Sequence, residues 1–381
     1  MDIRMVDTIT QYEKIRKEID LSISEVLNSG AYINGPSVGR FKQHLGEYLG
    51  VPYVIPCANG TDALQIALMA LDLQPGDEVI TSPFTFVATV EVIALLKAKP
   101  VFIDVEPGTF NLDPSKLEAA ITPLTKAIVP VHLFGQCADM EPILEIANRH
   151  NIPVVEDNAQ AIGAVYRFSD GTEKMAGTMG AIGTTSFYPS KNLGAYGDAG
   201  AIFTSNPELA EKIHVICNHG SKEKYYHESI GVNSRLDSIQ AAILDVKLRH
   251  LDSYNAARIQ AADTYDLLLK DCHAVVVPER ASGSTHVFHQ YTLRITAGRK
   301  ERDRIKNELA AAGVPAMVYY PVALHLQDAY REYGFQEGDF PVTEQLTEEV
   351  LSLPMHTELE KAQQEYIAQT LKNIAAMVKQ E

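Results

Sequence analysis

Between about residues 50 and 205, short apolar runs alternate with segments of helical periodicity. Leu64, Leu68 and Leu71 recur at spacings of four and three residues, which predicts an amphipathic helix, and residues 117–121 and 143–147 behave similarly. The apolar runs have no polar face, as expected of strands that helices cover on both sides. They predict strands at 78–81, 100–104, 127–131, 153–156, 181–187 and 199–204. This alternation indicates β-α units that feed a mostly parallel sheet in a large α/β/α sandwich.

The second half of the chain has a different pattern. Residues 235–270 are predicted to form one long helix that bridges two lobes, with Ile243 and Val246 on its apolar face. Beyond residue 272 the pattern predicts a strand at 287–295, a helix at 299–312 and a terminal helix from about 358. We expect these last elements to form a smaller C-terminal α+β domain.

Length and composition support two lobes of ordinary globular protein. A chain of 381 residues exceeds the size at which one hydrophobic core usually stops growing. We therefore expect a large domain over residues 1–250 and a small one over 251–381. Hydrophobic residues make up 46% of the chain and charged residues 22%, so a sizeable core is available.

The formal net charge of −16 argues against nucleic acid or an anionic membrane surface as a partner. An anionic substrate would need a local basic cluster. The longest apolar stretches are broken by charge well short of the roughly 20 residues of a membrane span, and the N-terminus lacks an apolar signal core. A cytoplasmic location is expected.

Neither the cysteines nor the histidines form a metal-binding pattern. The cysteines are widely separated and include no C-x-x-C pair, so we expect reduced thiols rather than disulfides or structural zinc; they are Cys57, Cys137, Cys217 and Cys272. The twelve histidines are scattered as well, although His286 and His289, for example, are only three residues apart. No catalytic metal is expected.

One lysine lies in an unusual environment. Lys191 follows the predicted strand at 181–187, within a run of small, hydroxylated and glycine residues, and Pro189 prevents the strand from continuing. The backbone therefore positions this lysine, whereas most lysines are simply solvated on a surface.

Three other features follow predicted strands or open a helix. Asp157 closes a buried strand, where open α/β sheets place ligand-binding groups, and it could pair with a protonated pyridine nitrogen or serve as a helix N-cap. Gly60 and Thr61 open a helix whose free N–H groups suit a phosphate, although an ordinary cap would look the same. Phe86 offers a plate for a flat ring, but an aromatic residue is more often core.

These features are more specific together than singly. A phosphate cup, a ring plate, an acid for a pyridine nitrogen and a lysine able to form a Schiff base are the parts of a pyridoxal 5'-phosphate (PLP) site. A nicotinamide dehydrogenase is the rival α/β enzyme, and its G-x-G-x-x-G turn follows none of the predicted strands.

The chain resembles the DegT/StrS-type nucleotide-sugar aminotransferases, which have the fold-type I PLP architecture. The resemblance covers essentially the whole chain. It rests on segments 33–36, 59–64, 75–80, 131–136, 156–160, 186–191 and 231–235, among them Glu-Asp-Asn-Ala-Gln and Ser-Phe-Tyr-Pro-Ser-Lys. A branch of sugar dehydratases replaces the lysine by histidine; Lys191 is present here, which favours transamination.

The resemblance implies a role for each matching residue. Lys191 would form the Schiff base, Asp157 would hold the pyridine nitrogen, and Gln160 would approach the phenolic oxygen of the ring. Phe86 would stack on the ring. The phosphate would be held by Gly60, Thr61, Ser186 and, from the neighbouring subunit of a homodimer with shared active sites, Asn233.

The resemblance also implies L-glutamate as the amino donor and ping-pong transfer to a ketosugar, in pathways to surface polysaccharides such as lipopolysaccharide. Several segments look most like enzymes acting on UDP-2-acetamido-2-deoxy-3-oxo-glucuronate, whose carboxylate Arg235 could bind. Tyr319 and His325 depart from that group and are closer to enzymes that make 3-amino sugars on dTDP. Tyr32, Tyr319 and His325 are candidate substrate residues under either reading, or residues that pack at the subunit interface.

Two further classes compete with this interpretation. A non-catalytic regulatory relative would keep the fold without turnover, but the intact Lys191, Asp157 and Ser186 argue against it. A PLP-dependent lyase or decarboxylase acting on a free amino acid would release carbon or eliminate a group instead of transferring the amine.

Overall fold

The computed structural model of the chain describes residues 2–376. Its centre is a twisted sheet built from β1 (Tyr53–Cys57), β2 (Glu78–Thr81), β3 (Lys99–Phe102), β4 (Thr125–Ile128), β5 (Val155–Asp157), β8 (Ile182–Ser186) and β9 (Gly200–Thr204). Ladders join β3-β2-β4 and β1-β9-β8-β5, and two parallel bridges, one of them Val131 to Asp157, join β4 to β5. The strand order is therefore β3-β2-β4-β5-β8-β9-β1.

The sheet is mostly parallel, as predicted. Strand β9 is antiparallel to both β8 and β1, whereas β2 is parallel to β3 and β4, and β5 is parallel to β8. Strand β2 occupies residues 78–81 as expected. Strand β1 lies at the sheet edge and was not predicted; Pro56 within it is tolerated because an edge strand has one unpaired side.

Helices cover both faces of this sheet: α2 (Pro36–Leu49), α3 (Gly60–Ala70), α4 (Ala88–Leu95), α5 (Met140–Arg149), α6 (Pro207–Cys217) and α7 (Ser238–Leu248). Successive strand residues face opposite sides. Val79 packs with α3, α4 and α6, whereas Ile80 packs with α5. Val54 of β1 packs with α2 and α7 on that second side. The predicted α/β/α sandwich is confirmed.

The prediction of one helix over 235–270 is wrong. Helix α7 ends at Leu248 and α8 (Leu251–Leu269) begins after His250, whose φ of −102° and ψ of −4° depart from the helical geometry. The helices serve different cores: Leu244 of α7 packs under the large sheet, and Tyr265 of α8 packs in the C-terminal core. The segment at 117–121 forms only a short 3-10 turn (Glu118–Ala120) instead of an α-helix.

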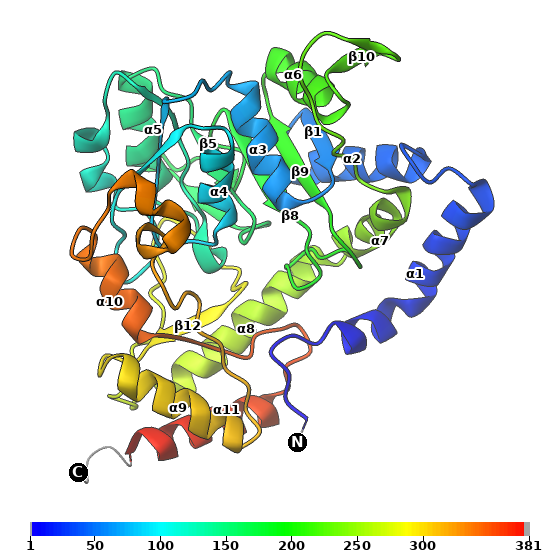
Figure 1. The fold of residues 1–381 in the computed structure, drawn as a ribbon. Helices are drawn as coiled ribbons and strands as arrows, with labels where there is room; N and C mark the ends of the chain where they lie inside the picture. The colour runs from blue at the N-terminus through cyan, green and yellow to red at the C-terminus, as the bar shows by residue number, and fades with distance from the viewer. Residues whose placement is uncertain (1, 377–381) are drawn as a thin grey trace.

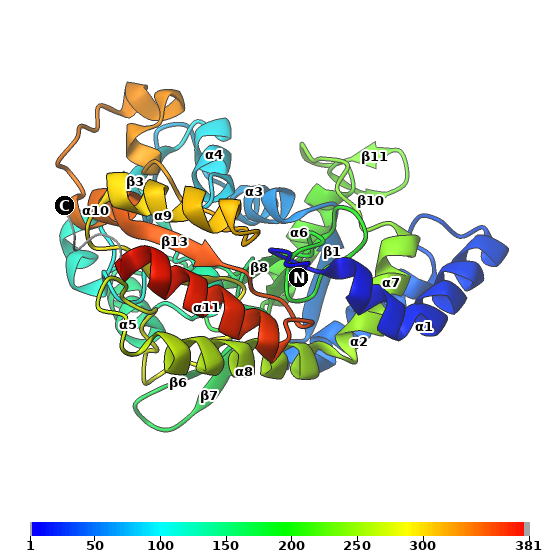
Figure 2. The ribbon, with the colours of Figure 1, turned by 90° about the horizontal axis from the view of Figure 1, so that it is seen from below.

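The C-terminal part contains β12 (Tyr291–Arg294), α9 (Arg299–Ala311), α10 (Pro341–Glu349), β13 (Val350–Leu353) and α11 (Lys361–Ala376). Strands β12 and β13 pair antiparallel, and α8, α9 and α11 pack around them in a separate core (Figure 2). This agrees with the expected α+β character. Ile3 from the N-terminus also lies in this core, and the boundary between residues 250 and 251 stays a prediction.

Three further features extend from the body. Helix α1 (Thr8–Ser29) packs on α7 through Ile15 and Ile19 and runs along one edge of the molecule (Figure 1). Two hairpins project from the surface: β6 (Val165–Arg167) with β7 (Glu173–Met175), and β10 (Ser221–Glu223) with β11 (Tyr226–His227). Within residues 2–376, no helix has the length and apolar character needed to cross a membrane.

Candidate active site

The carboxyl ends of the parallel strands surround a cavity of about 720 Å³. This edge of an open α/β sheet is where ligands are expected to bind. The lining comes from the turns after β1, β2, β4, β5 and β8 and from two segments of the C-terminal part. Among the predicted site residues it includes Gly60, Thr61, Phe86, Asp157, Gln160, Ser186, Lys191 and Tyr319.

The loop after β8 places Lys191 in this cavity. The loop closes through hydrogen bonds from the Lys191 amide to the Tyr188 carbonyl (2.8 Å) and from the Ala195 amide to the Phe187 carbonyl (2.8 Å). A side chain at Gly194 would come within 2.4 Å of the Pro189 carbonyl oxygen, so this tight loop requires glycine there. The small residues that drew attention in the sequence thus shape the turn that carries the lysine.

Asp157 lies on the same cavity and is almost completely buried. Its carboxylate accepts hydrogen bonds from the Thr89 hydroxyl (2.8 Å) and from the Ala159 amide (3.1 Å). Burial lowers the pKa of Lys191 to about 8, against the opposing effect of the Asp157 charge. With this pKa, roughly a tenth of the lysine is an uncharged, nucleophilic amine at pH 7 and about half is at pH 8.

The start of α3 forms an anion cradle. The Asn59 side chain caps the Asp62 amide at 2.8 Å, which leaves the amides of Gly60 and Thr61 for a ligand. A methyl group on Gly60 would come within 2.6 Å of the Ser186 Cβ, so the serine lies directly against the helix start. Backbone N–H groups and two hydroxyls can together hold a phosphate here.

A flat ring between the lysine and this cradle would meet Phe86 and Gln160. Phe86 is 53% exposed, which is unusual for a residue so close to the core and which fits an aromatic plate facing the cavity. The Gln160 Oε1 accepts from the Phe134 amide (2.7 Å), so its Nε2 points as a donor to the Tyr320 hydroxyl (3.2 Å). The group that Gln160 can offer to a ligand in this cavity is therefore its amide nitrogen, a hydrogen-bond donor.

These groups fit PLP: a cradle shaped by glycine for its phosphate, an aromatic face for its ring, an acid for its nitrogen and a partly buried amine for its aldehyde. When bound, the cofactor supplies the aldehyde and the electron-withdrawing ring that transamination requires. Fold and site together define the class as a PLP-dependent aminotransferase.

The chain belongs to the DegT/DnrJ/EryC1/StrS aminotransferase family, whose sequence pattern matches residues 13–372. The UDP-2-acetamido-2-deoxy-3-oxo-D-glucuronate aminotransferase of Pseudomonas aeruginosa is 46% identical over 97% of this chain and its own full length (100%). A pleiotropic regulatory protein of Geobacillus stearothermophilus is 48% identical over 97% and 98% of the two chains. The dTDP-3-amino-3,4,6-trideoxy-alpha-D-glucose transaminase of Streptomyces venezuelae is 40% identical over 95% and 93%.

Solved structures agree with this assignment. A family aminotransferase from Brucella abortus superimposes with a TM-score of 0.92 at 43% identity and covers 98% of this chain and 99% of its own. NtdA from Bacillus subtilis, solved with bound pyridoxamine phosphate, has a TM-score of 0.86 at 35% identity, over 95% of this chain and 82% of its own. The chain is a sugar aminotransferase that uses PLP.

Three predicted site residues lie together outside the cavity. Ser234 is buried and accepts a hydrogen bond from the Ala58 amide (3.0 Å), while its neighbours Asn233 and Arg235 are exposed and partly exposed. Tyr32 is 49% exposed and lies beside the start of α7, where its carbonyl accepts from the Ser238 amide (2.9 Å). Ser234 thus bonds two residues before the start of α3, and Asn233, Arg235 and Tyr32 are not part of the lining of the chain's own cavity.

His325 is also outside the cavity lining. It is buried, its Nε2 lies 3.0 Å from a Glu344 carboxylate oxygen, and its ring packs edge to face on Phe340. Tyr319, six residues earlier, does line the cavity and is half-buried, and burial raises the pKa of its hydroxyl. The two candidates from this segment are therefore separated by the fold.

Sequence reasoning missed several residues that line the cavity. His289 lines it with a buried Nδ1 that has no hydrogen-bond partner in the described chain, and its backbone carbonyl accepts from Arg258 (3.3 Å). Burial, with Lys191 and Arg258 nearby, holds the pKa of His289 far below its usual range, so its ring is uncharged. Tyr320 also lines the cavity and stacks on Phe134 with ring centroids 6.4 Å apart. The only signal for His289 was its spacing from His286, which allowed a metal-binding pair to be imagined although no catalytic metal was expected.

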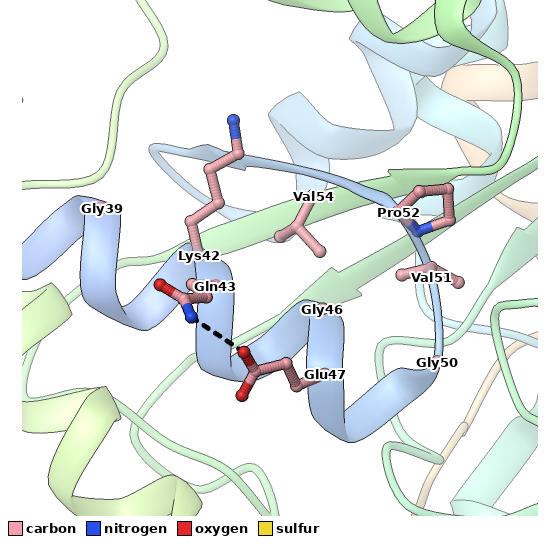
Figure 3. Close-up of a pocket in the computed structure, with 9 residues that line it drawn as sticks. All are labelled: Gly39, Lys42, Gln43, Gly46, Glu47, Gly50, Val51, Pro52 and Val54. Carbon is pink, nitrogen blue, oxygen red and sulfur yellow. Dashed lines mark hydrogen bonds between the residues drawn. The ribbon is translucent and has the colours of Figure 1, made fainter.

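A second hollow of about 410 Å³ lies between α2 and the edge strand β1 (Figure 3). Gly39, Gly46 and Gly50 open it, and Lys42 and Glu47 are its charged side chains. Glu47 is bonded to Gln43 within the same helix at 2.8 Å. The lining of this hollow contains Lys42 but no aromatic residue and no helix start, so it lacks the combination of groups that fits PLP in the cavity at Lys191.

Proposed function

We propose that this aminotransferase moves an amino group from L-glutamate to the 3-keto carbon of a nucleotide-linked sugar, with UDP-2-acetamido-2-deoxy-3-oxo-glucuronate as the preferred substrate. The observation that carries the proposal is the shared cavity of Lys191 and Asp157 in a chain 46% identical to an enzyme named for that substrate. The product would serve surface polysaccharide synthesis in the cytoplasm.

The proposed roles follow from what each side chain can do. Lys191 binds the cofactor through Nζ, and after the amino donor has displaced it, Nζ moves a proton to and from the reacting carbon. A pKa of about 8 suits that task because both the charged and the uncharged amine are populated near neutral pH. Asp157, held by Thr89, stabilises a positive charge on the ring nitrogen.

The remaining cofactor contacts are proposed from their positions in the cavity. Gly60, Thr61 and Ser186 bind the phosphate, Phe86 stacks on the ring, and the Gln160 Nε2 donates to the phenolic oxygen. These groups bind and orient without taking part in proton transfer, so their loss should weaken cofactor binding more than it changes the pH profile.

A homodimer with shared active sites accounts for Asn233, Arg235 and Tyr32. Ser234 bonds to the Ala58 amide just before the chain's own phosphate cradle, whereas Asn233 is exposed and Arg235 is partly exposed. We propose that Asn233 binds the cofactor phosphate of the partner subunit and that Arg235 binds the carboxylate of a sugar acid there, through two parallel hydrogen bonds. Tyr32 would contribute to the same shared site.

Mixed dimers test this sharing directly. Lys191→Ala and Arg235→Ala are each expected to lower activity strongly on the sugar-acid substrate. If the sites are shared, unfolding and refolding the two variants together should restore up to about a quarter of wild-type activity, because half of the dimers are mixed and each has one intact site. No recovery, with mixed dimers demonstrated by two affinity tags, would show that Arg235 acts within its own chain.

A dTDP-linked 3-keto-6-deoxyhexose is the second candidate substrate. It is favoured by Tyr319, which lines the cavity where the glucuronate enzymes are expected to have histidine, and by the Streptomyces relative at 40% identity. A neutral deoxysugar would leave Arg235 without a carboxylate. Arg235→Met should then change KM little, whereas with a sugar acid it should raise KM about 10-fold or more.

The deciding experiment presents the pyridoxamine form of the enzyme with UDP- and dTDP-linked ketosugars and follows the absorbance band of the lysine-bound cofactor. Return of the band with the UDP-3-keto-glucuronate alone is expected. Return only with dTDP sugars would replace the preferred substrate. The 48% identical regulatory relative makes a third outcome informative: no return with any sugar, in a protein whose Lys191 does bind PLP, would favour a regulatory role.

A further inference from the structure

His132 and Glu156 form a completely buried pair behind the active-site cavity. Both side chains are 0% exposed, and the His132 Nε2 lies 2.9 Å from a Glu156 carboxylate oxygen. Neither residue lines the cavity, and neither has a role in the function proposed above. A buried polar pair of this kind calls for an explanation, because desolvating both groups is costly.

The hydrogen bonds around the pair determine which nitrogen of His132 carries the proton. The Ala138 amide points at Nδ1 from 3.1 Å, and a backbone N–H can only donate. Nδ1 must therefore accept, so the proton of the neutral ring is on Nε2 and is donated to Glu156.

Glu156 is saturated with donors. Besides His132, its carboxylate accepts from the backbone amides of Gly177 (2.8 Å), Met179 (2.6 Å) and Gly180 (2.5 Å). These four donors together occupy the acceptor sites of the carboxylate. Glu156 thus fastens the turn before β8 to the middle of β5.

The backbone of His132 is bonded to the next residue of β5. Its amide donates to the Asp157 carbonyl at 3.0 Å, so one histidine binds Glu156 with its side chain and Asp157 with its main chain. Two residues later, the backbone N–H of Phe134 donates a hydrogen bond to the Gln160 Oε1. This bond sets the orientation of the Gln160 side-chain amide. The segment after β4 therefore contacts the main chain of Asp157 and the side chain of Gln160, the two polar residues proposed to face the cofactor ring.

We propose that His132 is a positioning residue: its Nε2–H bond to Glu156 fixes the segment after β4 against β5 and thereby aims Asp157 and Gln160 into the cavity. The inference rests on the cofactor roles proposed for Asp157 and Gln160. Glu156 and Asp157 are consecutive in a strand, so their side chains point to opposite faces. The hydrogen bonds of Glu156 on one face of β5 thus fix the position of the Asp157 carboxylate on the other face.

Two variants test the hydrogen bonds of the two imidazole nitrogens of His132 separately. In His132→Gln the side-chain amide nitrogen can take the place of Nε2 and donate to Glu156. In His132→Asn the shorter side chain can replace only Nδ1, so the carboxylate loses this donor. His356→Gln is the matched control, because His356 is also buried, accepts a hydrogen bond from a backbone amide through Nδ1 and lies outside the cavity lining.

Each variant is measured for PLP affinity by absorbance titration, for kcat and KM, and for melting temperature. We expect His132→Asn to weaken PLP binding and lower kcat by about 10- to 100-fold, the usual effect of misplacing a catalytic group by an ångström. His132→Gln should stay within about 3-fold of wild type. His356→Gln should lower the melting temperature only.

The proposal is overturned if Asn and Gln at 132 change affinity and kcat equally, or if both change only the melting temperature. Should His132→Asn fail to fold, wild-type protein with 15N-labelled histidine replaces it. A slowly exchanging Nε2–H signal that disappears in His132→Gln is expected, and an Nδ1–H signal would contradict the inference. Failure of the proposed function is distinguishable, because PLP affinity is measured without any sugar: wild-type protein would then bind PLP at Lys191 but aminate no nucleotide-linked ketosugar.

Discussion

Gly60 and Ser186 lie in such close contact that a methyl group on the glycine would come within 2.6 Å of the serine Cβ. Gly60 begins helix α3 and Ser186 ends strand β8, so this contact joins the phosphate cradle to the strand that leads to Lys191. The distance between the phosphate end and the lysine end of a bound cofactor is therefore set by direct packing of two elements more than a hundred residues apart.

Gly60→Ala should consequently displace the cradle from Ser186. We expect PLP affinity to fall by about 10-fold or more, because a misplaced cradle loses hydrogen bonds to a charged group. Gly39→Ala is the matched control, since nothing lies within 4 Å of the added methyl group in helix α2. Equal PLP affinity of the two variants in absorbance titrations would show that the contact does not shape the cradle.

The depressed pKa of Lys191 predicts how the cofactor-free enzyme captures PLP. The uncharged amine is the nucleophile, and its fraction grows as the pH rises through the pKa of about 8. The capture rate should therefore increase about 5-fold between pH 7 and pH 8 and level off above pH 9. Stopped-flow absorbance measures it, and a profile that rises only above pH 10 would mean that the lysine is not desolvated.

Asp157→Asn should move this profile in a defined direction. The negative charge of Asp157 raises the pKa of Lys191 and partly offsets the effect of burial. Without it the uncharged amine is favoured further, so the midpoint of the capture rate should shift below pH 8 although PLP binds more weakly. The Lys191→Ala variant, which cannot form the Schiff base at this position, gives the background absorbance change on adding PLP. A midpoint that moves upward would contradict the proximity of the two charges.

The sequence predicted six of the seven strands of the large sheet because local pattern defines them. Strand β2 lies at 78–81 as predicted. Its four residues are all buried, and polar residues precede and follow them in the sequence. The end of α7 at Leu248 had no such signal. Neither glycine nor proline occurs at Arg249 and His250, and the chain turns there because two separate cores each bury one helix. Tertiary packing of this kind leaves no local trace.

The candidate site also contains some residues that local sequence pattern predicts and others that only tertiary packing brings into place. Lys191, Asp157, Gly60 and Phe86 were found because each follows a strand or opens a helix at one sheet edge, where topology brings them together. His289 comes from a segment about a hundred residues further on, and only the docking of the C-terminal part puts it beside Lys191. His325 shows the converse: a position suggested by resemblance lies buried against Glu344.

Lys247 provides a prediction about stability. It is 1% exposed, its amine lies 5.2 Å from the centre of the Tyr196 ring, and burial, assisted by the charge of Arg258, lowers its pKa to about 7. In the unfolded chain the pKa is that of an ordinary lysine, 10.5. Between these two values the unfolded state binds the additional proton, so this group makes the free energy of unfolding increase with pH from about 7 to 10.5.

Lys247→Met should remove this dependence, since methionine fills similar space without a charge. At pH 6.5, where the lysine is charged in both states and its burial is most costly, the variant should be more stable than wild type by about 1–3 kcal/mol. The difference should shrink by pH 9, because by then the folded lysine is uncharged. Chemical denaturation at both pH values measures it, with Lys300→Met on the exposed face of α9 as the control. A loss of stability at both pH values would instead show that the amine has a partner, which a second subunit could supply.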